Sequence, residues 1–115
     1  MSPIHASEES ERLVAVFAAL GDVYRQSLLE TLVASGQASA TSLAESLPVT
    51  RQAIVKHLQV MERAGLVRST RQGRQVLYSI HHEQLRLSAH WLDSIATNWE
   101  HRLERIKDLA EKEGS

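Results

Sequence analysis

The sequence predicts one mainly α-helical domain that carries a single β-hairpin in its second half. Apolar residues recur at helical spacing through most of the chain. Residues 66–70 and 75–80 are instead rich in β-branched and aromatic side chains, and in the second of these segments the apolar side chains alternate. A chain of 115 residues suffices for one compact domain and leaves little room for another.

The chain is expected to consist of a flexible tail over residues 1–7 and a single domain over residues 8–112. The first helix is expected over residues 8–20. The second is expected to run to residue 35, with Asp22 as its N-cap. Its buried stripe is expected to contain Leu28, Leu29 and Leu32, with Val33 beside them.

Short elements are expected after the second helix. Gly36 stands where a helix often ends in a left-handed residue. A small strand is expected over residues 37–40 and a brief helix over residues 42–47. Within this brief helix, Ser42 and Glu45 have the spacing of a capping box.

The next helix is expected over residues 51–64, with Thr50 as its N-cap and Gly65 at its end. At about 100° per residue, this helix has two different faces. The side expected to face the core contains Ile54, Leu58 and Met61. The opposite side contains Gln52, Lys56, Gln59 and Arg63. Amides and cations opposite an apolar anchor suit a helix that lies in the major groove of DNA.

The two expected strands are joined by the turn Arg71-Gln72-Gly73-Arg74, in which the glycine permits a positive φ and the arginines give the hairpin a basic tip. The helical period then returns in a long last helix over residues 82–112. Helices joined by a tight turn and followed by a hairpin predict a winged helix-turn-helix.

The charge distribution supports DNA binding although the net charge is only −1. Residues 1–50 contain two basic and six acidic side chains, and residues 79–115 contain five and seven. Residues 51–78 contain six basic side chains against Glu62 alone. Because phosphate attraction acts over about 8 Å at physiological salt, a local basic segment is sufficient.

The expected DNA contacts follow from position and side-chain chemistry. Gln52 can pair with adenine and Lys56 can donate to guanine, so we expect both at base edges. Arg51 is expected to meet a phosphate, while Arg71 and Arg74 reach flanking phosphates or a minor groove. The complete expected set is Arg51, Gln52, Ala53, Lys56, His57, Gln59, Arg71 and Arg74.

Several motifs resemble, in order, those of ArsR/SmtB-type winged-helix repressors. They are Ala19-Leu20-Gly21-Asp22 with Arg25, Leu28-Leu29-Glu30-Thr31-Leu32, Leu43-Ala44-Glu45-Ser46-Leu47, Lys56-His57-Leu58, Ala64-Gly65-Leu66-Val67 and Gly73-Arg74-Gln75-Val76-Leu77-Tyr78. The resemblance covers roughly residues 12–80 and implies a dimeric repressor of its own or a neighbouring operon, built in the order α-α-α-α-β-β-α. Val55 departs from the Ser of many members, so one polar DNA contact is expected to be missing. For His57, the resemblance implies a DNA-backbone or structural contact, and a partly buried histidine at the core boundary is the alternative.

The last helix is expected to pair with a second copy of the chain, assisted by the first helix. Its apolar stripe runs about seven turns, which exceeds what so small a domain can cover by itself. The expected interface residues are Leu13, Phe17, Leu92, Ile95, Trp99, Leu103 and Ile106. A twofold dimer places its recognition helices about 34–36 Å apart and favours an inverted-repeat operator.

Many members of this family release DNA when a metal ion binds, but the sequence offers little support for a metal site in this chain. The chain has no cysteine, and Ser39 and Thr41 occupy the positions of the cysteine pair found in thiolate sensors. A last-helix site of the family finds partial counterparts here in His90, His101 and Glu104. The two histidines are eleven residues and thus about 16 Å apart along a helix, on the side opposite the apolar stripe. We therefore expect no metal site and no other cofactor.

The leading hypothesis is a cytoplasmic, homodimeric DNA-binding regulator that has no catalytic site and is expected to act as a repressor. A metal-responsive repressor using the last-helix residues and a winged-helix module for protein contacts are the alternatives. No enzyme is expected, because the sequence lacks a nucleophile elbow, a phosphate loop and paired carboxylates. No apolar run approaches the roughly 20 residues of a membrane span, and the N-terminus does not resemble an export signal.

Overall fold

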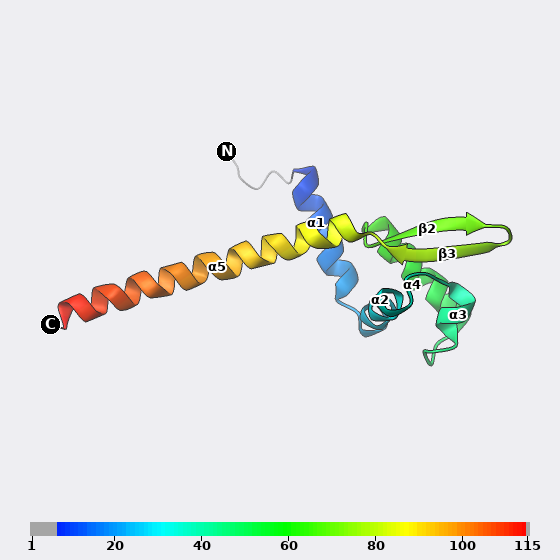
Figure 1. Ribbon diagram of the computed structural model, residues 1–115, viewed down its shortest axis with the longest axis horizontal. Helices are drawn as coiled ribbons and strands as arrows, with labels where there is room; N and C mark the ends of the chain where they lie inside the picture. Colours follow the sequence, from blue (N-terminus) through cyan, green and yellow to red (C-terminus); the bar gives the residue numbers. More distant parts are fainter. Residues whose placement is uncertain (1–6, 115) are drawn as a thin grey trace. The chain divides into compact units, whose positions relative to one another are not determined.

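The computed structural model describes residues 7–114, which form five helices and three strands (Figure 1). Their order is α1 (Glu8–Leu20), α2 (Val23–Ser35), β1 (Ala38–Ser39), α3 (Ala40–Ala44), α4 (Arg51–Arg63), β2 (Val67–Gln72), β3 (Gln75–Ile80) and α5 (His82–Glu113). The described chain divides into one unit that ends at Gln84 and another that begins at Leu85. Of the expected tail, only Ser7 lies within the described residues, and it caps α1 by accepting a hydrogen bond from the backbone N–H of Ser10.

The three strands form one antiparallel sheet in the order β1-β3-β2. β1 pairs with the middle of β3, where Ala38 lies opposite Tyr78 and Ser39 opposite Leu77. The pair β2–β3 forms the hairpin, or wing, visible in Figure 1. The small predicted strand within residues 37–40 is therefore confirmed, and it anchors the wing to the helical part of the fold.

The wing ends in a two-residue loop. Gln72 pairs with Gln75, which leaves Gly73 and Arg74 as the loop residues. Gly73 has a φ of +63°, and among the described residues only glycines have a positive φ. A positive φ at the first loop position alone is the pattern of a type II′ turn, which matches the twist of the flanking strands. β2 is consequently longer than predicted and includes Arg71 and Gln72.

The predicted N-caps of α2 and α4 and the predicted end of α2 are confirmed. An Asp22 carboxylate oxygen accepts from the backbone N–H groups of Tyr24 and Arg25, at 2.9 and 3.1 Å. The Thr50 hydroxyl accepts from the N–H of Ala53 at 3.1 Å and caps α4. Gly36 ends α2 with the expected positive φ, +84°.

The predicted helix over residues 42–47 and its capping box are wrong. α3 begins at Ala40, and its cap is Ser39, whose hydroxyl accepts from the backbone N–H of Ser42 at 3.1 Å. Pairing with β3 holds Ser39 in an extended conformation, which is the geometry that an N-cap requires. Ser42 therefore lies inside the helix, and Glu45 lies at its C-terminal end.

The core of the first unit forms where α1 packs on α2 and α4, and where α2 also meets β3. Its fully buried side chains are Val16, Leu28, Leu32, Leu43, Ile54, Leu58, Met61, Leu66 and Val67. The predicted core side of α4 is thus confirmed. The prediction for Val33 is wrong, since its side chain is 67% exposed. Val33 lies about 100° around the helix from Leu32, beyond the edge of the buried stripe.

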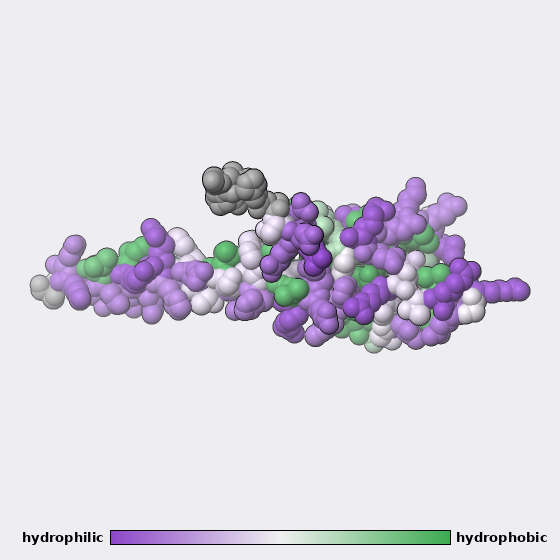
Figure 2. Space-filling model, turned by 90° about the horizontal axis from the view of Figure 1, so that it is seen from above, coloured by the Kyte–Doolittle hydropathy of each residue, from purple (hydrophilic) through white to green (hydrophobic). Residues whose placement is uncertain are grey.

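α5 is a single helix of 32 residues. Its predicted apolar stripe is present, and five of its members are each between 47% and 56% exposed. They are Leu92, Ile95, Trp99, Leu103 and Ile106. Figure 2 shows apolar side chains at the surface of α5 among hydrophilic ones. None of the helices in residues 7–114 has the length and hydropathy of a membrane span.

We expect Leu58→Ala to lower the free energy of unfolding by about 2–5 kcal/mol, because it leaves a cavity at a fully buried position of α4. Urea denaturation followed by circular dichroism measures the change. Val33→Ala is the control, and we expect it to change stability by less than about 0.5 kcal/mol. Equal losses for the two variants would contradict the burial described here.

Candidate nucleic-acid interface

The α4 polar face comprises the four residues that the sequence predicts opposite the core. Gln52, Lys56, Gln59 and Arg63 are all exposed, whereas Ile54, Leu58 and Met61 are fully buried. None of the four forms a hydrogen bond or salt bridge with another residue of the described chain. Their amides and cations are therefore available to a ligand.

The start of α4 is fixed to α3 by a side-chain hydrogen bond. The Nε–H of Arg51 donates to the hydroxyl of Thr41 at 3.0 Å. This bond crosses the turn between the two helices and holds the Arg51 side chain at the first turn of α4. Because Nε is used internally, the terminal nitrogens of the guanidinium can bind an anion. Thr41 was not among the site residues expected from the sequence.

The wing supplies the remaining expected contacts. Arg68, Arg71 and Arg74 are exposed along it; Arg68 and Arg71 lie on β2, and Arg74 lies in the loop. The wing is also tied to the end of α4, because the hydroxyl of Ser69 donates to a carboxylate oxygen of Glu62 at 2.7 Å. The single acidic residue of the basic segment is thus engaged at the junction of α4 and β2.

His57 lies on the side of α4 that meets the first two helices. It is half-buried, and its Nδ1 is 3.3 Å from a terminal nitrogen of Arg25. This contact links α4 to the start of α2 through the His57 ring and the Arg25 guanidinium. The Tyr24 ring lies beside it, with 6.0 Å between ring centroids. Of the two roles that the resemblance implies for His57, the contact with Arg25 favours the structural one over a contact with the DNA backbone.

Arg25 connects three elements through one side chain. Its Nε donates to the carbonyl of Ala19 at 2.6 Å, near the end of α1, while a terminal nitrogen reaches His57 on α4. The same terminal nitrogen lies 4.0 Å from the Asp22 carboxylate. The sequence motifs contained Arg25, but periodicity could not reveal this role, because it depends on how the helices cross.

The pKa of the Asp22 carboxyl is changed by its neighbours at this junction. The hydrogen bond from the backbone N–H of Arg25 lowers its pKa below the ordinary value, assisted by the N–H of Tyr24 and the positive charge of Arg25. Partial desolvation opposes this effect. The ionised form of Asp22 is therefore the form that caps α2.

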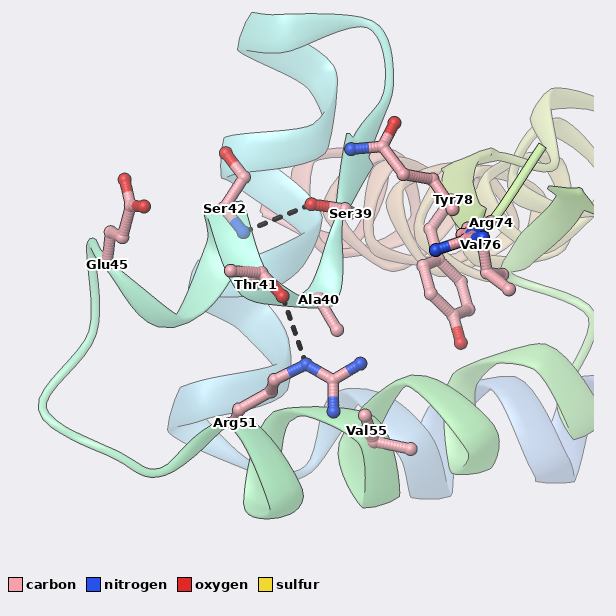
Figure 3. A pocket seen from close by; sticks show the side chains of 11 residues that line it. Ser39, Ala40, Thr41, Ser42, Glu45, Arg51, Val55, Arg74, Val76 and Tyr78 are labelled. Carbon is pink, nitrogen blue, oxygen red and sulfur yellow. Dashed lines mark hydrogen bonds between the residues drawn. The ribbon is translucent and has the colours of Figure 1, made fainter. Parts of the chain in front are cut away.

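A cavity of about 620 Å³ lies between α3, the first half of α4 and β3 (Figure 3). Its lining residues are Ser39, Ala40, Thr41, Ser42, Glu45, Arg51, Val55, Arg74, Gln75, Val76 and Tyr78. A shallower hollow lined by Arg51, Gln52, Val55, Lys56 and Gln59 adjoins it along α4. Because Arg51 and Val55 line both, the α4 polar face and the wing belong to one continuous surface.

The three candidate metal ligands of the last helix are not gathered by the structure. Within residues 7–114, no group of three or more His, Asp or Glu side chains is placed to hold a metal ion. His90, His101 and Glu104 are all exposed on α5. The expected lack of a metal response remains a prediction.

Comparisons with known proteins agree with this architecture. A helix-turn-helix domain family matches residues 20–70. The HTH-type transcriptional regulator YuzN of Bacillus subtilis is 37% identical over 86 residues, covering 69% of this chain and 94% of that protein. The transcriptional repressor SdpR of the same species is 29% identical over 77 residues, covering 67% and 84%.

Solved structures show the same similarity. An ArsR-like transcriptional regulator from Rhodococcus sp. RHA1 has a TM-score of 0.77 and 42% identity, covering 87% of this chain and 93% of that chain. The winged helix-turn-helix domain Mb0332 of Mycobacterium bovis, which is homodimeric, shares the fold with a TM-score of 0.66 and 22% identity, covering 84% and 89%.

A helix with a bare polar face, next to a basic two-stranded wing, defines a winged helix-turn-helix transcription regulator with a DNA-binding domain. The chain belongs to the ArsR/SmtB-type family of these regulators.

We expect the stability difference between the wild-type protein and Asp22→Asn to depend on pH. Because the pKa of Asp22 is lowered on folding, its ionised carboxylate stabilises the fold above the ordinary aspartate pKa of about 3.9. That contribution is lost as the pH falls through the lower pKa of the folded state. Urea denaturation of both proteins from pH 7 downward measures it, and an advantage that persists at the acid end would refute the assignment.

Proposed function

We propose that this regulator is a homodimeric, sequence-specific repressor that binds an inverted-repeat operator. The observation that carries the proposal is the continuous surface of the α4 polar face and the wing, both exposed and lined by cations and amides. In this proposal residues 8–112 act as one DNA-binding and dimerisation domain. It works in the cytoplasm, where the operator lies.

Base recognition is assigned to the first two turns of α4. Gln52 and Lys56 lie there on the outer side, and Gln and Lys can read adenine and guanine in the major groove. Arg51, Arg71 and Arg74 are assigned to phosphates, which fix the register of the protein on the duplex. Ala53 lies beside Gln52 and is half-buried, which suits close approach of the helix to DNA.

Dimerisation is assigned to the apolar stripe of α5, with Leu13 and Phe17 of α1. Five large apolar side chains that are each about half exposed favour association, because burying them removes apolar surface from water. Val14 adds a further exposed apolar side chain to α1, at 69%. A twofold arrangement presents two copies of α4 to the DNA and thereby favours a symmetric operator.

The direct test is binding of the pure protein to fragments of its own upstream region, with zinc and with a chelator. Binding that is the same in both conditions supports a regulator without a metal effector. Binding abolished by zinc would instead favour the metal-responsive alternative. No binding to any fragment would favour a protein-contact module.

We expect Gln52→Ala to relax the preference at one base pair, with a cost of about 1–3 kcal/mol on the preferred sequence. Lys56→Ala tells whether Lys56 contacts a base or a phosphate. Loss of a base contact relaxes the preference at one base pair, whereas loss of a phosphate contact weakens binding on every sequence and lowers its salt dependence. Selection from a random duplex library measures the preference. Lys107→Ala on α5 is the matched control. An unchanged preferred sequence for Gln52→Ala would refute the assignment of base recognition.

We expect Trp99→Glu to dissociate the dimer, because a charge on the apolar stripe would be buried without a partner. His101→Glu is the control, since its side chain lies about 200° around the helix from Trp99. Sedimentation velocity measures the oligomeric state of both variants. If Trp99→Glu remains a dimer, the interface lies elsewhere.

A further inference from the structure

We propose that the cavity between α3, α4 and β3 is a binding site for a phosphate group, which the backbone of the bound DNA supplies. The inference rests on the proposed function and deepens it, because it replaces general attraction to DNA with one defined phosphate contact.

The position of the cavity matches the path of a DNA strand. The major and minor grooves of DNA are separated by a phosphate backbone, so a protein that reads one groove with a helix and the next with a wing must straddle that backbone. The cavity has α4 on one side and β3 of the wing on the other. It shares Arg51 and Val55 with the hollow beside Gln52 and Lys56.

Cations line the cavity from both sides. Arg51 is held by its hydrogen bond to Thr41, and Figure 3 shows its guanidinium group directed into the space between α3 and α4. Arg74 contributes from the wing. Planar guanidinium groups suit phosphate oxygens, and a guanidinium that is already positioned loses less freedom on binding. The two arginines thus provide charge, and the bond to Thr41 provides positioning.

Tyr78 provides the most specific sign of a ligand. Its side chain is only 8% exposed and lines the cavity, yet its hydroxyl makes no hydrogen bond to any residue of the described range 7–114. The hydroxyl is not sealed from solvent, since the same range contains no fully buried side-chain polar atom without a partner. A nearly buried donor facing an open cavity can gain a bond to a ligand at little cost.

Tyr78 is in the protonation state that a phosphate requires. Burial raises the pKa of its phenol, the negative charge of Glu62 raises it further, and the positive charge of Arg51 partly opposes these effects. At neutral pH the phenol is therefore protonated and donates a hydrogen bond.

The carboxylate that lines the cavity does not counteract this chemistry. Glu45 follows the last residue of α3, and Figure 3 shows its side chain at the outer edge, directed away from the guanidinium of Arg51. The hydroxyl of Ser39 is used to cap α3, whereas Ser42 adds a further hydroxyl to the lining. With only five residues, α3 is too short for its dipole to matter, and the proposed phosphate contact does not depend on it.

The test removes the Tyr78 hydroxyl and measures DNA affinity and stability together. We expect Tyr78→Phe to weaken binding to a duplex selected by the wild-type protein on the order of tenfold, with the preferred sequence unchanged. Its stability should not fall, since the hydroxyl has no partner in the described residues. Tyr24→Phe is the matched control, because it removes the same atom from a tyrosine outside the cavity lining.

Duplexes with a single uncharged methylphosphonate locate the phosphate. At one position per half-site, the methylphosphonate and Tyr78→Phe should each weaken binding, and together they should cost less than the sum of both. Strict additivity at every position overturns the inference. Equal DNA affinity of Tyr78→Phe and the wild-type protein also overturns it.

Inorganic phosphate separates the two sources of the ligand. Calorimetric binding of free phosphate that depends on Tyr78, combined with DNA affinity that does not, would make this a small-anion site and overturn the assignment to DNA. If the wild-type protein binds no duplex at all, the proposed function fails and this inference fails with it. An unaffected Tyr78→Phe overturns this inference alone.

Discussion

The rotation of α4 about its own axis is the constraint on which the rest of the structure depends. Ile54, Leu58 and Met61 are fully buried, and their spacing leaves α4 only one way to pack. The same packing turns Gln52 and Lys56 outward. Stability and the proposed DNA recognition therefore belong to opposite sides of one helix, and neither side can change its direction without the other.

Polar links at the ends of α4 complete what packing begins. At its start, Thr50 caps the helix and Arg51 reaches Thr41. At its end, Glu62 accepts from Ser69 of the wing. Such bonds are individually modest, at about 1 kcal/mol, but they are directional in a way that apolar contacts are not. They fix the wing and the α3–α4 turn relative to α4, the helix to which we assign base recognition.

Elements whose determinants are local could be predicted from the sequence. The ranges of α1 and α2, the caps Asp22 and Thr50 and the core side of α4 follow from period and side-chain type alone. α3 could not be predicted, because its cap depends on the pairing of Ser39 with a strand about 40 residues later. The cavity around Tyr78 was missed for the same reason, since it exists only after β1, β3 and α4 come together.

The alternation of side chains along β3 limits how the wing can change during evolution. Val76 and Tyr78 lie two residues apart on β3 and both line the cavity. Deleting Leu77, which lies between them, would turn one of these two side chains to the opposite surface. The loop residues Gly73 and Arg74 lie outside the strands, so this alternation does not constrain the length of the loop. The reach of the wing tip is therefore free to vary, whereas Val76 and Tyr78 both keep lining the cavity only if the strand between them changes in steps of two.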